Sequence, residues 1–123
     1  EKTYVSPVIN KNDQGEIFEE FLEVFRKDSI FRYSRINFPI KGFNSNAEMG
    51  KRENYIWSKP IWSFYTEPSF SNKKDQNIIS EFFLEKKLMV WRLYKKNSGY
   101  DLRYYFDKKN GIWMLVSYSH SRF

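Results

Sequence analysis

The C-terminal third of the chain constrains the fold most, because three strand-like runs follow one another there with a turn signal between each pair. The runs are Leu88–Lys95, Tyr100–Lys108 and Ile112–Ser119. Asn97–Ser98–Gly99 separates the first two runs, and Asn110–Gly111 separates the last two. Asn-Gly is the strongest short hairpin signal, because both residues tolerate the positive φ of a type I′ turn. The sequence therefore predicts a three-stranded antiparallel meander.

Two-residue turns at both sites predict the register of this meander. They place Trp91 opposite Tyr104, Phe106 opposite Leu115 and Tyr104 opposite Ser117. A slip of one residue would exchange the two faces of a strand. With this register one face carries no charge: Met89, Trp91, Leu93, Tyr100, Leu102, Tyr104, Phe106, Trp113 and Leu115. The other face is mixed: Arg92, Tyr94, Asp101, Arg103, Tyr105, Asp107, Val116, Tyr118 and His120. A three-residue turn at Asn110–Gly111 would mix the two sets, so we prefer the two-residue turns.

Residues 16–27 carry the clearest helix pattern. Apolar residues recur there at spacings of three and four, which makes one broad stripe: Ile17, Phe18, Phe21, Leu22, Val24 and Phe25. Asp13 and Glu16 fit a capping pair at the start of the helix. We expect the stripe to pack on the uncharged face of the meander. Residues 1–15 are interpreted as an N-terminal arm, and residues 16–123 as a single domain.

The segments between the helix and the meander are less regular. The run Phe31–Ile40 resembles a strand that stops at Pro39 and Gly42. Residues 43–55 are polar and predict a loop. Residues 56–66 fit either a short helix capped by Ser58 or an edge strand interrupted by Pro60. Residues 78–87 fit either a short helix or a strand.

Composition excludes several classes of protein. Aromatic residues make up 20% of the 123 residues, which supplies a real core and excludes disorder along the whole chain. No stretch approaches the roughly 20 apolar residues of a transmembrane helix. The chain has no Cys and one His, so no disulfide framework, thiol nucleophile or His-based metal cluster is expected. The five Gly are isolated and form no phosphate-binding loop. We therefore expect no metal and no cofactor.

The net charge of +6 is unevenly distributed. Residues 1–28 contain 4 basic and 7 acidic residues, a net charge of −3, whereas the remainder contains 17 basic and 8 acidic residues, a net charge of +9. The basic residues occur mostly as scattered pairs such as Lys51/Arg52 and Lys86/Lys87. Such pairs are more typical of solvated loops and sheet edges than of a nucleic-acid-binding stripe.

Two segments carry a resemblance to known proteins. FLEVFRKDSIFRYSRINFPI (21–40) and RYYFDKKNGIWML (103–115) resemble an uncharacterised family of envelope proteins from Bacteroides-type gut anaerobes, which carries a domain-of-unknown-function label. One helix, connecting segments and a long meander also resemble the nuclear-transport-factor-2-like superfamily, with its cystatin-like cone. The resemblance implies an α+β fold: an NTF2-like cone, with the N-terminal helix packed on a curved antiparallel sheet that ends in the three-stranded meander.

The same resemblance implies a compartment. Proteins of this type are exported, and a lipoprotein signal usually precedes the domain. We therefore expect a periplasmic protein or an outer-membrane-anchored lipoprotein, with its lipid anchor upstream of Glu1. That expectation suits a sequence that starts without Met and contains no Cys.

Two rows on the mixed face of the meander are candidate sites. The first row contains Tyr94, Asp101 and His120, in which the carboxylate could orient the imidazole as a general base. An exposed polar cluster is the alternative that we favour, because the sequence indicates no nucleophile beside it. The second row contains Arg92, Arg103 and Tyr118, with Tyr105 nearby on the same face. Two opposed Arg residues repel each other unless an acidic ligand, a partner, or the nearby Asp101 and Asp107 neutralises them. Stacking of both guanidinium groups on tyrosine rings is the simpler structural explanation.

Three functions compete on these grounds. The first is a non-catalytic envelope module that binds a protein, a glycan or a second copy of itself through the Tyr/Arg face. The second is a small-molecule binder or enzyme with a pocket inside the cone, lined by Trp57, Trp62 and Trp91. The third is binding of single-stranded nucleic acid, which the pI of about 9.4 suggests and the missing glycine-rich aromatic signature disfavours. The lack of a catalytic motif favours the first function over an enzyme.

Overall fold

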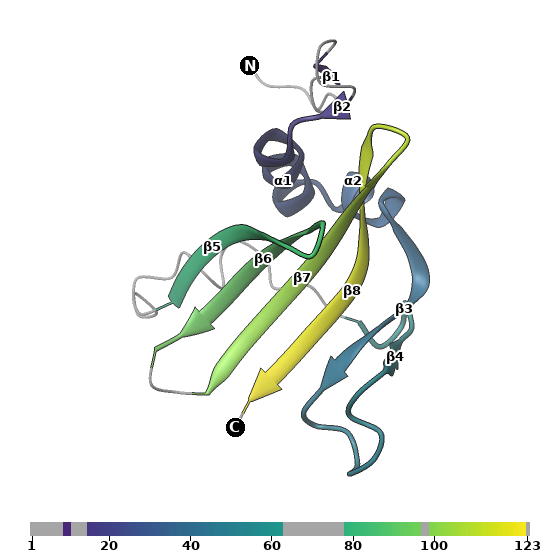
Figure 1. The fold of residues 1–123 in the computed structure, drawn as a ribbon. Coiled ribbons are helices and arrows are strands. Elements are labelled where there is room, and N and C mark those ends of the chain that lie inside the picture. The colour runs from purple at the N-terminus through teal and green to yellow at the C-terminus, as the bar shows by residue number, and fades with distance from the viewer. Residues whose placement is uncertain (1–8, 11–14, 63–77, 97–98, 123) are drawn as a thin grey trace.

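A computed structural model of the protein describes residues 9–10, 15–62, 78–96 and 99–122. It contains a six-stranded sheet in the order β4-β3-β8-β7-β6-β5, two helices and a separate two-stranded pair, β1-β2 (Figure 1). The elements of the main sheet are β3 (Ile36–Asn44), β4 (Tyr55–Trp57), β5 (Ile78–Glu85), β6 (Leu88–Lys95), β7 (Tyr100–Lys109) and β8 (Ile112–Arg122). The helices are α1 (Phe18–Lys27) and α2 (Ser29–Ser34), and the short pair is β1 (Ile9–Asn10) and β2 (Gly15–Glu16).

Helix α1 forms where the apolar stripe predicts it. Phe18, Phe21, Leu22 and Phe25 are its buried side chains. The rings of Phe18, Phe21 and Phe25 all lie within 5.2–5.4 Å of Phe106 on β7, measured between centroids. The predicted role of Glu16 in capping is wrong, because the helix begins after Ile17 without a side-chain cap. Asp13 lies outside the described residues.

The strand predicted over Phe31–Ile40 is wrong in its first half. Ser29–Ser34 form the short helix α2, and Asp28 caps it by accepting a hydrogen bond from the backbone N–H of Phe31 at 3.0 Å. Strand β3 begins only at Ile36. The Asp28–Ser29 dipeptide thus ends one helix and starts another. A helix of only six residues is too short to show a clear period of 3.6.

The predicted meander is present as β6, β7 and β8. Trp91 lies opposite Tyr104, and Phe106 lies opposite Leu115, as the two-residue turns require. Asn110 and Gly111 adopt φ values of 53° and 85°, the left-handed conformation that a tight hairpin turn demands. Of the ambiguous segments, residues 78–85 form strand β5, and residues 55–57 form the short strand β4.

The predicted register of β8 fails beyond Leu115 because of a β-bulge. Tyr105 pairs with Ser117 whereas Phe106 pairs with Leu115, so Val116 is an extra residue on β8. A bulge opposes two residues to one and shifts the faces of everything after it. Tyr104 therefore lies opposite Tyr118, and the predicted pairing of Tyr104 with Ser117 is wrong.

The predicted fold class is also wrong. An NTF2-like cone has a helical layer packed against a curved antiparallel sheet, whereas the described part of this chain is mostly strand with two short helices, and its main sheet is mixed. Strand β3 runs parallel to β8 and antiparallel to β4. The backbones of β3 and β8 approach so closely at Gly42 that a Cβ there would lie 1.6 Å from the carbonyl oxygen of Tyr118. A glycine is required at this contact.

The two described helices pack on the same face of the sheet, which we call the covered face (Figure 1). The large buried rings of Trp91, Tyr104 and Tyr118 belong to this face and to the core. The opposite face, here called the open face, alternates with it along β5 to β8: Glu81, Phe83, Val90, Arg92, Tyr94, Asp101, Arg103, Tyr105, Ser117, Ser119 and Ser121. The described helices leave this face uncovered, although Val90 within it is fully buried.

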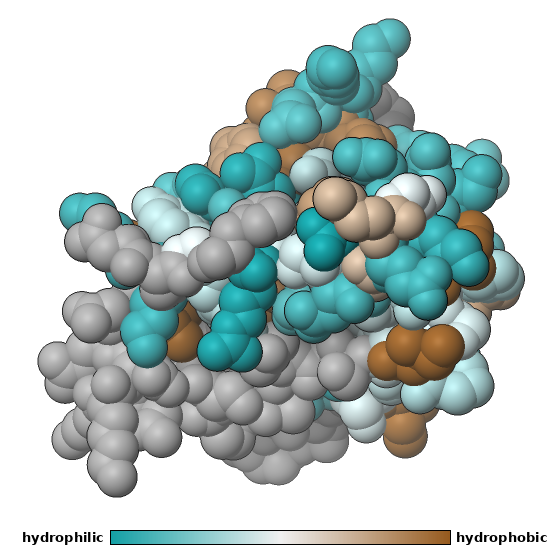
Figure 2. Space-filling model, turned by 90° about the horizontal axis from the view of Figure 1, so that it is seen from below, coloured by the Kyte–Doolittle hydropathy of each residue, from teal (hydrophilic) through white to brown (hydrophobic). Residues whose placement is uncertain are grey.

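The surface of the described residues is largely hydrophilic when the molecule is viewed from below, with hydrophobic side chains in separate places (Figure 2). Leu84 on the edge strand β5 is 70% exposed, and Ile30 on α2 is 85% exposed. No helix in the described part of the chain is long and apolar enough to span a membrane.

Candidate functional site

The open face carries three charged side chains in mutual contact, Arg92, Asp101 and Arg103, which we call the Arg–Asp cluster. Register places Arg92 directly opposite Arg103 on neighbouring strands, as predicted. Asp101 lies between them. Arg92 Nη2 donates to Asp101 Oδ2 at 2.8 Å and Arg92 Nε donates to the same carboxylate at 3.2 Å, while Arg103 Nε donates to Oδ1 at 3.3 Å. The repulsion expected between two opposed guanidinium groups is thus neutralised from within the chain.

The cluster is partly shielded from water and held on two further sides. The Arg92 guanidinium lies 3.8 Å from the centroid of the Tyr94 ring, and its Nη1 lies 3.5 Å from Glu81 Oε2. The side chains of Arg92, Asp101 and Arg103 are 26%, 22% and 32% exposed. Burial alone would raise the pKa of the Asp101 carboxyl, but hydrogen bonds from both arginines outweigh it and hold that pKa below its ordinary value. The carboxylate is therefore ionised throughout the neutral range.

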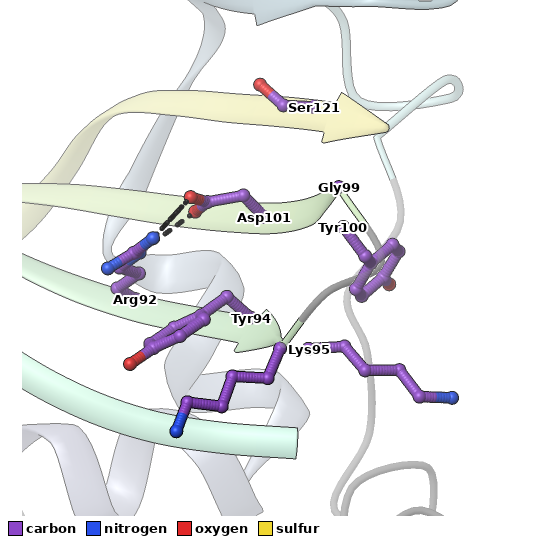
Figure 3. Close-up of a pocket in the computed structure, with 8 residues that line it drawn as sticks. Arg92, Tyr94, Lys95, Gly99, Tyr100, Asp101 and Ser121 are labelled. Atoms are coloured by element: carbon purple, nitrogen blue, oxygen red, sulfur yellow. Dashed lines mark hydrogen bonds and ion pairs between the residues drawn. The ribbon is translucent and has the colours of Figure 1, made fainter. Parts of the chain in front are cut away.

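A groove of about 380 Å³ adjoins the cluster where β6 ends and β7 begins. Arg92, Tyr94, Asp101 and Ser121 contribute from the open face, and the remaining lining residues surround the turn: Lys95, Lys96, Gly99 and Tyr100. Figure 3 shows the Arg92–Asp101 pair with Tyr94 beside it and Lys95 at the end of β6. Cations therefore outnumber anions among the groove residues.

The predicted site residues Tyr118 and His120 do not join this group. The bulge at Val116 turns both side chains to the covered face, and Ser119 and Ser121 occupy the predicted positions opposite Arg103 and Asp101. Tyr118 is buried against Trp57, with ring centroids 4.9 Å apart. The Tyr94–Asp101–His120 row is therefore wrong, because His120 lies opposite Leu102.

His120 instead makes an edge contact with Tyr100, at 6.3 Å between ring centroids. Its Nδ1 has no hydrogen-bond partner among the described residues. Burial lowers the pKa of this imidazole, because the charged form is less well solvated. Among the described residues, no carboxylate is hydrogen-bonded to this imidazole to orient it as a general base.

The other predicted residues lie on both faces. Tyr105 is half-buried on the open face, two residues from Arg103, and burial raises the pKa of its hydroxyl. Trp57, Trp62 and Trp91 are all buried in the core. Trp62 contacts Tyr118 edge to face at 5.9 Å, and Trp91 stacks on Tyr104 at 4.8 Å. These indoles fill core positions.

A second ion pair, which was not predicted from the sequence, joins Glu16 to Arg35, and we call it the buried clamp. Arg35 Nη1 and Nη2 donate to the two carboxylate oxygens of Glu16 at 2.7 and 2.6 Å. Glu16 Oε1 also accepts from the backbone N–H of Trp113, and Arg35 Nη1 donates to the Trp113 carbonyl oxygen. The clamp joins β2, the end of α2 and β8. No local pattern could reveal it, because its partners lie 19 and 97 residues apart.

The arrangement on the open face suits binding better than proton transfer. A carboxylate with a lowered pKa is a weak base and cannot supply a proton at neutral pH. The guanidinium groups remain charged, so the cluster presents fixed donors and acceptors in one geometry. Within the described residues, no three His, Asp or Glu side chains gather as a metal site would require.

Known proteins share the fold of this chain and identify its family. An NMR structure of a protein from Bacteroides uniformis ATCC 8492 superposes with a TM-score of 0.60 over 85% of this chain and 76% of that one, at 22% sequence identity. Similarity at this level shows a shared fold. No curated protein matches the sequence. The family model described as "Domain of unknown function (DUF4348)" matches residues 3–123, and the chain therefore belongs to that family.

Proposed function

We propose that the protein is a non-catalytic binding module of the cell envelope, and that its ligand is an acidic glycan held at the Arg–Asp cluster and the adjoining groove. The observation that carries the proposal is the preorganised cluster itself. Two arginines and one carboxylate are already fixed in contact, so a ligand need not order these long side chains when it binds. Preorganised groups of this kind favour affinity and specificity.

The charge of the groove supports an anionic ligand. Arg92, Lys95 and Lys96 contribute three positive charges to the lining, and Asp101 contributes one negative charge. The two guanidinium groups in contact with Asp101 outweigh its single negative charge, and the rim lysines add to the positive potential. A carboxylate on the ligand would meet these lysines.

The remaining lining residues favour a saccharide over a peptide or a nucleic acid. Ser121 and the Asp101 carboxylate offer hydrogen bonds to hydroxyl groups, and Tyr94 and Tyr100 offer ring surfaces. The groove volume of about 380 Å³ is at the small end of ligand sites, which suits one or two rings. Single strands of nucleic acid need a basic groove that follows several nucleotides.

Titration of the isotope-labelled protein with short probes tests the proposal. We expect oligogalacturonate to shift the amide signals of Lys95, Gly99 and Ser121, and a neutral oligosaccharide of the same length to leave them unchanged. A loss of about tenfold in affinity is expected for Lys95→Glu, the size of one strong ionic contact.

Lys51→Glu is the matched control, because Lys51 is 75% exposed in the loop after β3 and carries the same charge. It should bind like the wild type. Oligoglutamate and single-stranded DNA serve as further probes. If either bound more tightly than oligogalacturonate, or if Lys95→Glu and Lys51→Glu weakened binding equally, the glycan proposal would be wrong.

The envelope location belongs to the same proposal. It is supported by the likeness of residues 21–40 and 103–115 to envelope proteins of Bacteroides-type anaerobes. Fractionation of cells that make the native protein, followed by antibody detection, tests it. Recovery with the cytoplasmic proteins would contradict it.

A further inference from the structure

Strand β5 is an edge strand with few of the usual protections. It is the last strand in the sheet order (Figure 1). All eight of its residues pair with β6 without a register shift. No described strand or helix covers its outer edge, so its outward N–H and C=O groups lack ladder partners in the described residues. Natural edges are usually shortened, bulged or interrupted by Lys or Pro. Residues Ile78–Glu85 contain no bulge, no Lys and no Pro.

Two of the four exposed residues of β5 are apolar, whereas the other two, Ser80 and Glu85, are polar. Leu84 is 70% exposed and Phe82 is 41% exposed, and both point to the covered face. The Phe82 ring lies 5.5 Å from that of Phe18, so it continues the aromatic core outward to the surface. A strand added at this edge would bury both side chains and satisfy the open backbone groups.

We propose that β5 pairs antiparallel with β5 of a second copy of the chain, so that two sheets join into one. Two-fold symmetry limits the register of such a pair. If residue i of one copy lies opposite residue j of the other, the sum of the two residue numbers, i + j, is the same for every opposed pair. An even sum keeps equivalent faces of the two sheets on the same side. The helices of both copies then lie on one side and both open faces on the other.

Charge and the length of overlap together select one register among these, because two-folds centred nearer either end of β5 pair fewer residues. A two-fold centred on Glu81 or on Phe83 would place Glu81 opposite Glu81 or opposite Glu85, and like charges directly opposite are unfavourable. A two-fold centred on Phe82 pairs seven residues of each strand without opposing two carboxylates. It places Phe82 opposite the partner's Phe82, an aromatic cross-strand pair, and Leu84 opposite the partner's Ser80. Among the even sums, this register therefore pairs the longest stretch of β5 that avoids directly opposed carboxylates.

Sedimentation equilibrium of the full chain tests the pairing. We expect a reversible dimer in the wild type. Leu84→Lys should raise its dissociation constant about tenfold, because the two-fold symmetry places the substituted residue in the interface twice. Ile30→Lys is the matched control: Ile30 is 85% exposed on α2, and its substitution adds the same charge away from the edge. It should dimerise like the wild type. A monomeric wild type, or equal effects of the two substitutions, would overturn the proposal.

Cysteine cross-linking tests the register, because the chain has no native Cys. Directly opposed residues have Cα atoms about 4.5–5.5 Å apart, within the range of a disulfide. Phe82→Cys should therefore give a covalent dimer on mild oxidation. The two copies of residue 84 would lie four residues apart, about 13 Å, so Leu84→Cys should not.

Cross-linking through residue 84 and not through residue 82 would reject this register.

Circular dichroism melting shows whether Phe82→Cys remains folded after losing its contact with Phe18. A wild type that stays monomeric, but whose β5 amides are protected from exchange by an unrelated apolar peptide, would assign the edge to a foreign strand instead.

Discussion

The buried clamp and the Arg–Asp cluster use the same chemistry in two environments. In the clamp, the Glu16 and Arg35 side chains are 1% and 10% exposed and meet through two short parallel hydrogen bonds. In the cluster, one carboxylate is shared between two arginines that are about a quarter to a third exposed. A charge that water cannot reach depends wholly on its partner, whereas a charge near water can be resolvated when its partner is lost. The clamp therefore serves the fold, and the cluster remains accessible to a ligand.

The largest effect is expected from breaking the clamp on one side. Glu16→Ala leaves the Arg35 guanidinium buried without its carboxylate, which should lower the free energy of unfolding by about 3–5 kcal/mol. That is a large share of the 5–15 kcal/mol typical of a domain. Urea denaturation followed by tryptophan fluorescence measures it.

A matched double variant sharpens this prediction. Glu16→Leu with Arg35→Met replaces both charges by apolar groups, and we expect it to be more stable than either single substitution. The backbone N–H of Trp113 would still lose its acceptor, Glu16 Oε1, so some stability is not recovered. If the single and double variants were equally unstable, packing rather than charge would explain the role of Glu16.

A smaller effect is expected at the cluster. Asp101→Asn removes the charge that separates Arg92 from Arg103 and should lower the free energy of unfolding by about 1–2 kcal/mol at neutral pH. Asp107→Asn, on the same strand and the same face, is the control and should change it less. Thermal unfolding of the three proteins provides the comparison.

The difference in unfolding free energy between the wild type and Asp101→Asn should depend on pH, because the pKa of Asp101 is lowered in the folded protein. A carboxylate with a depressed folded pKa stabilises the fold fully above its unfolded pKa of about 4, and this contribution is lost as the pH falls through the folded pKa. The wild type and Asp101→Asn should therefore converge in stability on acidification below pH 4. A difference that stays constant down to the lowest pH would contradict the assignment.

The smallest effect is expected at an ion pair in water. Glu23 and Lys27 on α1 lie one helical turn apart, with side chains 49% and 59% exposed. Glu23→Ala should lower the free energy of unfolding by only about 0.3–0.5 kcal/mol, and this loss should shrink further in high salt. A loss as large as that of Asp101→Asn would show that the effects on stability at the clamp, the cluster and this pair do not follow their exposure to water.

Local patterns predicted α1, the meander and the Arg92–Arg103 opposition, because each depends on residues close in sequence or on one tight turn. These local patterns did not predict the bulge at Val116, although the spacing of the residues on β8 carries a signal for it. The covered-face residues Trp113 and Leu115 are two apart, whereas Leu115 and Tyr118 are three apart. That extra residue breaks the strand period and marks a bulge. One unnoticed residue displaced Tyr118 and His120 from the predicted site.

The remaining differences arise from interactions over long distances in the sequence. Nothing near β3 indicates that it pairs parallel with β8, since that pairing joins Gly42 to Tyr118 across the whole intervening chain. The buried clamp is hidden for the same reason. Without the parallel pairing, helix and meander alone resembled a cone, and the predicted fold class followed that resemblance.

The parallel pairing of β3 with β8 has a consequence for how the domain forms. Strands β5 to β8 can assemble through hairpins, each closing a short loop, but β3 and β4 gain their place in the sheet only through β8. The pairing of β3 with β8 joins residues about 75 apart in sequence, and non-local contacts of this kind cost loop-closure entropy and slow folding. During synthesis the β3–β4 pair emerges early and must wait for the last strand of the domain. We expect the β3–β4 segment to be the part of the domain most prone to misfolding, and its folding to depend most on the rate of translation.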